Sequence, residues 1–561
     1  MPEILHPALL LIAGGCLLPF LRGGVRGAAI VAIPLAALYC VWQVPDGPAW
    51  QWRFLGHDLA PLAGDRLSRL FATIFSLMAA GAGLFAIGQK SRLEVPAAFV
   101  YAGAAVGAVL AGDLVSLFVF WELMAIGSTL VIWSAGGGPA YTASLRYLMI
   151  HLLGGVLLFA GIAGHVAATG SVAFTAMAPD SVAHWLILAG FLVNAGAPPL
   201  SAWLPDAYPE ASWSGTVFLS AFTTKTAVYV LLRGFPGAEV LVWVGLFMVF
   251  YGIVYALLEN DMRRILAYSI VNQVGFMIAG IGIGTEMALN GAAAHAFTHI
   301  IYKALLLMSA GSVLLMAGRR KCSELGGLFH SMPLTTLCGS IGALAISSFP
   351  LTSGFISKSM ISQAAADGHL LGVWLLLTAA SAGVFLHAGI KFPWFVFFQK
   401  DSGLRPPEPP ASMRAAMVVF AFLCIALGIW PEALYALLPY QADYEPYTGA
   451  HVLAQLQLLL FSGLAFFVLL PQLKRTLTIT LDLDWFYRRL FPALALRLEQ
   501  LFAIVRSAWA GAFAPALQRL ESLLERETRP GSMLMRARST RAMALWVMAM
   551  LLGYLLLYYL R

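Results

Sequence analysis

The dominant feature of this sequence is a series of about sixteen apolar stretches, each long enough to cross the roughly 30 Å hydrocarbon core of a bilayer as a helix. They lie near residues 4–20, 27–44, 68–88, 96–111, 113–134, 146–168, 183–204, 213–234, 239–258, 263–284, 291–317, 333–355, 371–399, 412–432, 451–471 and 541–560. Hydrophobic residues make up 60% of the 561 residues and charged residues only 11%, against roughly 25% charged in soluble proteins. We therefore exclude a soluble protein and predict an all-α polytopic membrane protein with about 14–16 transmembrane helices.

The charge pattern predicts an orientation and gives no reason to expect a nucleic-acid partner. The net charge of +7 comes from basic residues in short loops, where membrane orientation signals lie. Loops that fall on one side of the membrane carry Arg22, Arg26, Lys90, Arg92, Arg263 and Arg264. The positive-inside rule makes this side cytoplasmic and the N-terminus external. The first stretch follows Met-Pro-Glu without a basic n-region, so we expect it to be a retained span.

The cysteines and glycines indicate no resident cofactor. The five cysteines are Cys16, Cys40, Cys322, Cys338 and Cys424, and they form no C-x-x-C motif or regular spacing. No nucleotide-binding glycine loop follows a strand-like segment. We expect no disulfide framework, no metal site, no cofactor and no redox chemistry in this chain.

Two apolar stretches are interrupted by proline. The seventh contains Ala197-Pro198-Pro199-Leu200 followed by Trp203-Leu204-Pro205-Asp206, and the twelfth contains Phe349-Pro350-Leu351-Thr352-Ser353-Gly354. Proline removes backbone donors that lipid cannot replace, so such breaks must be buried in protein or line a wet cavity. Because five spans separate the breaks, we predict two inverted five-helix repeats with broken helices.

The chain divides accordingly into six predicted segments. They are an N-terminal three-helix segment (1–90), a first five-helix repeat (96–234), a second five-helix repeat (239–400), further transmembrane helices (410–472), an amphipathic helix (473–540) and a C-terminal transmembrane helix (541–561). In the amphipathic segment, apolar residues recur every three or four positions. Basic residues follow before the last span: Arg526, Arg529, Arg536, Arg538 and Arg541. This helix either lies on anionic lipid or straps neighbouring subunits together.

Ionisable residues inside the spans are the first functional candidates, because each costs several kcal/mol in lipid unless it is paired or solvated. They are Glu122, Lys225, His295, His299, Lys303, Lys358 and Lys391. His295, His299 and Lys303 follow one another at four-residue spacing and share one helix face. Such a set favours a proton path, since buried lysines and imidazoles can load and release protons. Each residue also has a structural alternative, in which it only joins helices by hydrogen bonding.

Several motifs resemble those of the antiporter-like subunits shared by respiratory complex I and Mrp-type cation/proton antiporters. The resemblance covers residues from about 60 to 400, and its motifs are Phe120-Trp121-Glu122-Leu123-Met124, Trp203-Leu204-Pro205-Asp206-Ala207, Asp261-Met262-Arg263-Arg264, the histidine and lysine stripe, and Gly354-Phe355-Ile356-Ser357-Lys358. Asp206-Ala207-Tyr208-Pro209-Glu210 is most similar to the D-type subunits of Mrp antiporters, whereas the C-terminal tail is similar to the longer complex I subunit. The resemblance implies a core of about fourteen helices, two half-channels and a midplane row of charged residues.

The resemblance also implies roles for individual residues. Glu122 is the acidic member of a glutamate–lysine pair, Lys225 the next lysine, His295, His299 and Lys303 the central relay, and Lys358 the residue that controls exit. Two positions depart from the family pattern. Asn194 stands where the family has the paired lysine, and Ser201 stands where it usually has histidine. We therefore expect Lys225 or Arg146 to pair with Glu122, or the first half-channel to be inactive.

These expectations favour a proton-translocating, antiporter-like subunit in the inner membrane of a bacterium, within an Mrp-type Na⁺/H⁺ antiporter or a complex I-like assembly. Its expected partners are other membrane subunits, the lipid bilayer, protons and Na⁺. The alternative is a scaffold subunit that does not pump, keeps the fold and docks partners through its C-terminal helix. The Asn194 substitution supports that alternative.

Overall fold

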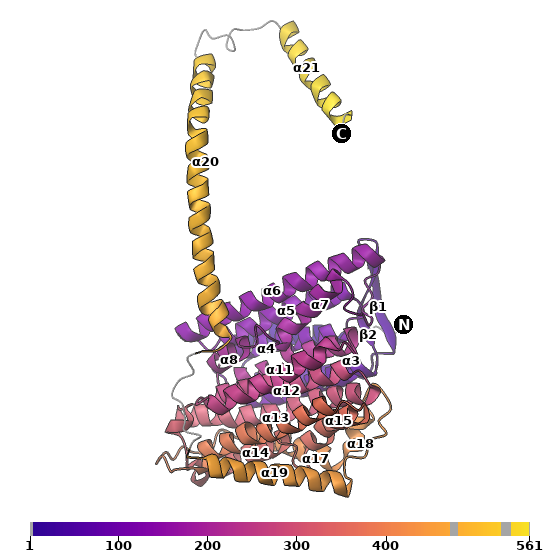
Figure 1. The fold of residues 1–561 in the computed structure, drawn as a ribbon, viewed down its shortest axis with the longest axis vertical. Coiled ribbons are helices and arrows are strands. Elements are labelled where there is room, and N and C mark those ends of the chain that lie inside the picture. The colour runs from indigo at the N-terminus through magenta and orange to yellow at the C-terminus, as the bar shows by residue number, and fades with distance from the viewer. Residues whose placement is uncertain (1–3, 472–480, 529–539, 560–561) are drawn as a thin grey trace. The chain divides into compact units, whose positions relative to one another are not determined.

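The computed structural model describes residues 4–471, 481–528 and 540–559. The chain forms two compact units, Met1–Asp484 and Trp485–Arg561. In the first unit, two helices, an antiparallel hairpin and a third helix come first: α1 (Pro7–Leu17), α2 (Gly23–Val41), β1 (Gly47–Phe54), β2 (His57–Gly64) and α3 (Arg66–Phe85). Figure 1 shows this unit as a stack of helices that run side by side.

Two successive sets of helices follow. The first set is α4 (Glu94–Leu110), α5 (Leu114–Trp133), α6 (Gly137–Thr169), α7 (Val182–Ala195), α8 (Trp203–Ala207), α9 (Gly215–Leu219) and α10 (Thr223–Gly234). The second set is α11 (Val240–Leu258), α12 (Met262–Ile283), α13 (Glu286–Ala317), α14 (Pro333–Ile346), α15 (Ser353–Asp367) and α16 (Leu371–Val384), with π-helical turns η5 (Phe385–Lys391) and η6 (Trp394–Phe398). The unit closes with α17 (Ala411–Ile429), α18 (Pro431–Tyr435) and α19 (Gly449–Leu469).

Most of the predicted spans contain a helix of membrane-spanning length. Among the described residues, twelve helices are long and apolar enough to cross a membrane. Four shorter apolar helices accompany them: Pro7–Phe20, Glu94–Leu110, Val182–Ala195 and Pro333–Ile346. Together these sixteen elements correspond to the sixteen apolar stretches of the sequence, and the chain is a multi-pass membrane protein.

Both predicted helix breaks are present. The chain leaves helical geometry between α7 and α8, where Gly196 adopts a φ of 77°, and again between α14 and α15, where Leu351 adopts a φ of 66°. Five predicted spans separate the breaks, and the relation of the two helix sets as inverted repeats stays a prediction. A third break, at Ser220 between α9 and α10, was not foreseen because no proline marks it.

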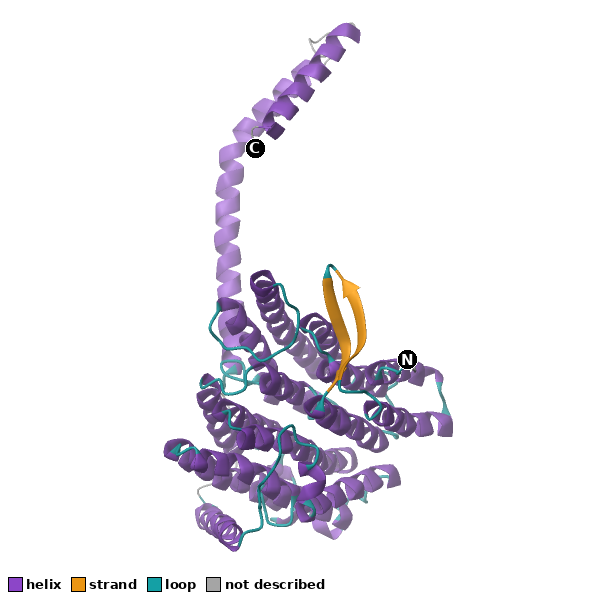
Figure 2. Ribbon diagram, turned by 90° about the vertical axis from the view of Figure 1, so that its right-hand side faces the viewer, coloured by secondary structure: helices purple, strands orange, loops and turns teal. Residues whose placement is uncertain are grey.

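The hairpin β1–β2 is the main element that the sequence analysis missed (Figure 2). Its strands pair antiparallel across Leu55 and Gly56, and Gly56 adopts a φ of 82° that favours glycine. Trp50 Nε1 donates to the Ile4 carbonyl at 3.1 Å and ties the hairpin to the start of the chain. Because apolar segments dominate this sequence, a short amphipathic strand pair gives only a weak signal beside them.

The core lies around α10, α12 and α13. The most apolar window of α12 is completely buried, and α12 packs against both α11 and α13 (Figure 1). A helix that is apolar on all sides is suited to such a central position. The few polar side chains on these helices are therefore held deep inside the protein, away from lipid.

The second unit contains the predicted amphipathic helix and final span. After η7 (Phe486–Leu490), α20 (Phe491–Thr528) runs for 38 residues, which corresponds to about 57 Å at 1.5 Å per residue. The last helix is α21 (Thr540–Tyr559). Of the predicted basic stretch, Arg526 and Arg541 lie in these helices, whereas Arg529, Arg536 and Arg538 lie outside the described residues.

Candidate functional site

A hydrogen-bonded polar cluster lies where α12, α13 and α15 meet. His295 contacts Ser357 Oγ through Nδ1 and Gln273 Oε1 through Nε2, each at 3.1 Å. Tyr302 also donates its hydroxyl proton to Gln273 Oε1 at 3.1 Å. These side chains are fully buried. The cluster joins three helices through hydrogen bonds between uncharged polar side chains.

Lys303 and Lys358 directly follow two members of this cluster in the chain, Tyr302 and Ser357, and their ammonium groups donate to neutral oxygens. The Lys303 ammonium donates to Ser269 Oγ at 2.8 Å. Lys358 Nζ donates to the carbonyl of Ile346 at 3.2 Å and lies 4.9 Å from the centre of the Phe276 ring. Ile346 is the last residue of α14, so the break supplies the carbonyl that holds Lys358.

The His299 ring lies beside this cluster, with its centre 5.2 Å from that of the Tyr302 ring and 6.2 Å from that of the His295 ring. Its ring is fully buried, and neither ring nitrogen has a hydrogen-bond partner among the described residues. The ammonium groups of Lys225, Lys303 and Lys358 all act electrostatically on this ring. Because Lys225 belongs to the first set and the other two lysines to the second, His299 lies within electrostatic range of both.

Lys225 repeats the arrangement of Lys358. Its Nζ donates to the Ser220 carbonyl at 2.7 Å and to Thr224 Oγ1 at 3.0 Å. Ser220 lies in the break between α9 and α10, so this lysine also binds a carbonyl that an interrupted helix leaves free. In both helix sets, a buried lysine therefore donates to a backbone carbonyl at a helix break.

Glu122 does not pair with Arg146. The Arg146 guanidinium instead binds Asp206 of α8 through two hydrogen bonds of 2.7 Å, which corrects the expectation that it faces Glu122. Glu122 Oε1 is buried and has no hydrogen-bond partner among the described residues. A Cβ on Gly155 would collide with the Glu122 carboxylate, so the glycine makes room for that group on α6.

The two positions that depart from the family pattern lie close to this region. Asn194 is fully buried, and neither its amide nitrogen nor its oxygen has a hydrogen-bond partner among the described residues. A Cβ on Gly154 would lie 3.4 Å from Asn194 Oδ1. Gly154 therefore faces Asn194, and its neighbour Gly155 on α6 faces Glu122. Ser201, between α7 and α8, is also buried with an unpartnered hydroxyl. Such orphaned groups fit a site that water or an ion completes.

Lys391 occupies a different kind of site. Its Nζ donates to the carbonyls of Ala256, Leu257 and Glu259 at 3.1, 2.5 and 2.6 Å. These carbonyls lie at the C-terminal end of α11, where a cation is favoured by both the helix dipole and the unpaired acceptors. This geometry supports the structural alternative for Lys391.

Sequence reasoning missed several uncharged polar members of these networks. Gln273, Ser357 and Tyr302 hold the His295 ring, and Gln273 stands in the middle of an otherwise apolar span. In the first set, Tyr147 contacts Ser128 Oγ at 3.0 Å and Thr223 Oγ1 at 3.2 Å. A buried amide in a span was the available signal for Gln273, because only a hydrogen bond makes its burial tolerable.

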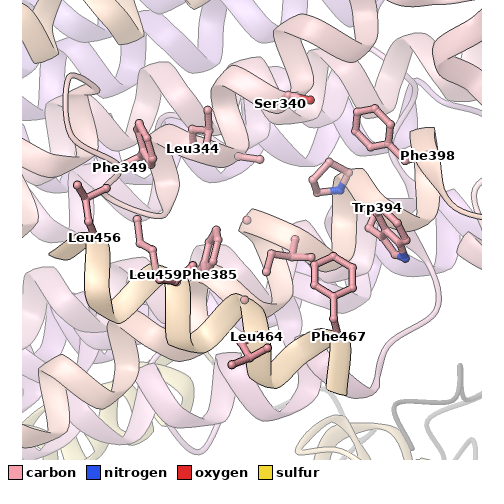
Figure 3. Close-up of a pocket in the computed structure, with 16 residues that line it drawn as sticks. Ser340, Leu344, Phe349, Phe385, Trp394, Phe398, Leu456, Leu459, Leu464 and Phe467 are labelled. Carbon is pink, nitrogen blue, oxygen red and sulfur yellow. The ribbon is translucent and has the colours of Figure 1, made fainter. Parts of the chain in front are cut away.

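The largest apolar groove that we describe lies apart from this row. It has a volume of about 700 Å³ and lies between α14, the turns η5 and η6, and α19. Its wall includes Leu344, Phe385, Leu459 and Phe467, and none of its lining residues is titratable (Figure 3). A groove of this composition cannot relay protons.

Comparison with known proteins identifies the family. The family described as "NADH:quinone oxidoreductase/Mrp antiporter, TM" matches residues 111–385. The A/B subunit of a probable K⁺/H⁺ antiporter from Rhizobium meliloti is 31% identical over 357 residues, which are 59% of this chain but only 36% of that relative. The D subunit of the Na⁺/H⁺ antiporter from Alkalihalophilus pseudofirmus is 30% identical over 370 residues, which are 61% of this chain and 75% of that protein.

The fold has a counterpart among solved structures. A chain of the Mrp complex from Dietzia sp. DQ12-45-1b superposes with a TM-score of 0.77 at 24% sequence identity. The match covers 95% of this chain and 64% of that chain. The chain therefore spans a little over a third of the Rhizobium relative and about two thirds of the Dietzia chain.

Proposed function

The chain belongs to the NADH:quinone oxidoreductase/Mrp antiporter family of transmembrane proteins, and from this premise we propose that it translocates protons as one subunit of a larger membrane assembly. The observation that carries the proposal is a buried set of lysines and histidines in which the ammonium groups of both helix sets bind carbonyl and hydroxyl oxygens. Protons would enter at Glu122 and pass along a row formed by Lys225, His299, Lys303, His295 and Lys358.

The row has the properties that a relay needs. Each member is buried, so its charge is felt strongly by its neighbours. The lysines are held by carbonyl and hydroxyl oxygens, which stabilise a positive charge without neutralising it. Gln273, Ser357 and Tyr302 orient the His295 ring, so that it can pass a proton between defined neighbours.

We propose further that proton movement is coupled to a monovalent cation, Na⁺ being the first candidate. Relatives named as Na⁺/H⁺ and K⁺/H⁺ antiporter subunits support this coupling. The same bacterial relatives support placement in a bacterial inner membrane. The basic loops of the sequence support an N-terminus on the outside. Any redox chemistry would belong to partner subunits.

A scaffold role is the second candidate, and one observation favours it. The position that should provide a cation for Glu122 is Asn194, and Arg146 is already bound to Asp206. If the first helix set cannot exchange a proton at Glu122, the chain could hold the assembly together while another subunit transports.

Replacing Lys303 distinguishes the two roles. We expect Lys303→Ala to abolish proton uptake in vesicles that contain the complete native assembly, because the row loses its central cation. Lys90→Ala removes an exposed loop lysine and serves as the control, with transport expected to stay at the wild-type level. Normal transport by a fully assembled Lys303→Ala complex would contradict the relay and favour the scaffold.

The C-terminal unit gives a separate test of assembly. We propose that α20 straps a neighbouring subunit, since a 38-residue helix with apolar residues along its length exceeds what one bundle needs to close itself. Deleting residues 490–561 should release that subunit during purification and leave the first unit folded. If the truncated chain still brings down every partner, α20 only lies on the membrane surface.

A further inference from the structure

Two histidines from adjacent helices face each other at one end of the α6–α7 pair. His165 lies in the last turns of α6, and His184 lies in the first turn of α7. The distance between His165 Nδ1 and His184 Nε2 is 3.0 Å. Neither residue belongs to the charged row, and their separation of nineteen positions in the chain matches no ligand-spacing motif.

The surroundings of His184 fix which of its nitrogens carries the proton. Its Nδ1 lies 2.8 Å from the Ala178 carbonyl and 2.9 Å from Asp180 Oδ1. A carbonyl and a carboxylate only accept hydrogen bonds, so Nδ1 must be the protonated nitrogen. In the neutral ring, Nε2 therefore presents its lone pair to His165. The Nδ1 proton of His165 then lies between the two rings and is donated to His184 Nε2.

A role as the mouth of a proton path along this helix pair does not fit the packing. Between the histidines and the Glu122 region, a Cβ on Gly161 would lie 2.7 Å from Ile187 Cγ1, and one on Gly190 would lie 2.8 Å from Leu158 Cβ. The two helices thus touch through their glycines and leave no space for a file of water along this seam. The histidine pair needs a different explanation.

We propose that His165 and His184 bind a divalent first-row transition ion, with Zn²⁺ as the reference ligand. Imidazole nitrogens bind Zn²⁺ at about 2.0–2.1 Å in a tetrahedron, which requires the two nitrogens to be roughly 3.3 Å apart. The observed 3.0 Å is close to that spacing. When the ion enters, the His165 proton moves to Nε2, so that Nδ1 of His165 and Nε2 of His184 both offer lone pairs.

Asp180 supplies the second part of the site. Histidines that bind metals usually donate their other ring proton to a carboxylate or carbonyl, which fixes the ring and strengthens the donor nitrogen. Asp180 and the Ala178 carbonyl already do this for His184. Among the described residues, no third His, Cys, Asp or Glu side chain forms a metal-binding group with the pair, so the two imidazoles would be the only protein ligands and water would take the remaining positions. On the predicted orientation, the site faces the outside of the cell.

Zinc binding to the purified assembly, free of affinity tags, tests the proposal. We expect equilibrium dialysis with Zn²⁺ alone to show one bound ion that is lost in both His165→Ala and His184→Ala. His165→Gln keeps a hydrogen-bonding side chain and should also lose the ion. Because this variant is expected to fold, its loss of Zn²⁺ could not be attributed to misfolding. Asp180→Asn should weaken binding by about 10–100-fold.

A histidine in the hairpin provides the matched control. His57→Ala, on the same predicted side of the membrane, should bind Zn²⁺ like the wild type. A thermal melt in detergent gives a second readout, because Zn²⁺ should raise the melting temperature of the wild type and not that of His184→Ala. Unchanged Zn²⁺ stoichiometry and affinity in folded His165→Gln and His184→Ala would overturn the site.

Discussion

Replacing Gly155 by alanine tests whether the position of the Glu122 carboxylate matters, without removing its charge. A Cβ at Gly155 would lie 2.8 Å from Glu122 Cδ and 3.2 Å from Oε2, and would overlap Oε1. Since ordinary contacts between such atoms begin near 3.4 Å, the carboxylate must move by roughly an ångström. The new methyl group therefore acts as a wedge between α5 and α6.

The expected effect on stability is small. Alanine is favoured over glycine inside a helix by about 1 kcal/mol, and forcing a side chain off its rotamer costs about the same. The free energy of unfolding should therefore change by less than about 1 kcal/mol. Proton transfer is more demanding, because donor and acceptor must lie within hydrogen-bond distance or be bridged by one water. We expect the transport rate to fall at least about tenfold.

The assay is proton uptake by reconstituted vesicles, normalised to the amount of assembled complex. Gly164→Ala is the matched control on the same helix, because its Cβ would meet only Ala183, at 3.1 Å. Wild-type transport in Gly155→Ala would refute the reasoning, whatever the effect of Glu122→Gln. If Glu122→Gln also transports normally, the first helix set carries no protons through this residue.

Three further predictions concern the charged groups around the row. Asn194→Lys should shift the pH optimum of transport without abolishing it, because a new ammonium beside Glu122 restores the missing partner; an unchanged pH profile would argue against this. Lys391→Met should lower the melting temperature in detergent by the equivalent of about 3 kcal/mol and leave transport per folded complex intact, since it exposes the α11 carbonyls to an apolar group. Asp206→Asn should destabilise the fold by about 2 kcal/mol, less than for a fully buried pair because the Arg146 side chain is 27% exposed, and an unchanged melting temperature would show that the pair contributes nothing.

The spans and their breaks were accessible from the sequence because both depend on local chemistry. Length and apolarity identify a span, and Pro198, Pro199 and Pro350 cannot continue a helix that lipid surrounds. The stripe of His295, His299 and Lys303 was accessible for a similar reason, since four-residue spacing fixes a shared helix face. Each of these inferences needs only a few consecutive residues.

The partners of the charged groups were not accessible in this way. Arg146 binds Asp206, sixty positions away, although Glu122 looked equally suitable in the sequence. Gln273 reaches His295 and Tyr302 from another helix. Such choices depend on how helices are rotated against one another, and that rotation is set by packing between segments distant in the chain.

The choice of partner also separates structural charges from those suited to a relay. A carboxylate neutralises its cation and fixes it in place, as Asp206 does for Arg146. A carbonyl stabilises an ammonium group through its dipole but does not neutralise its positive charge. The charges of Lys225 and Lys358 can therefore still interact electrostatically with the His299 ring. Carbonyls that lack a partner within their own helix occur where a helix is interrupted or ends. If the row relays protons as proposed, the broken helices serve its electrostatics, because they supply the neutral carbonyls that bind Lys225 and Lys358 without cancelling their charge.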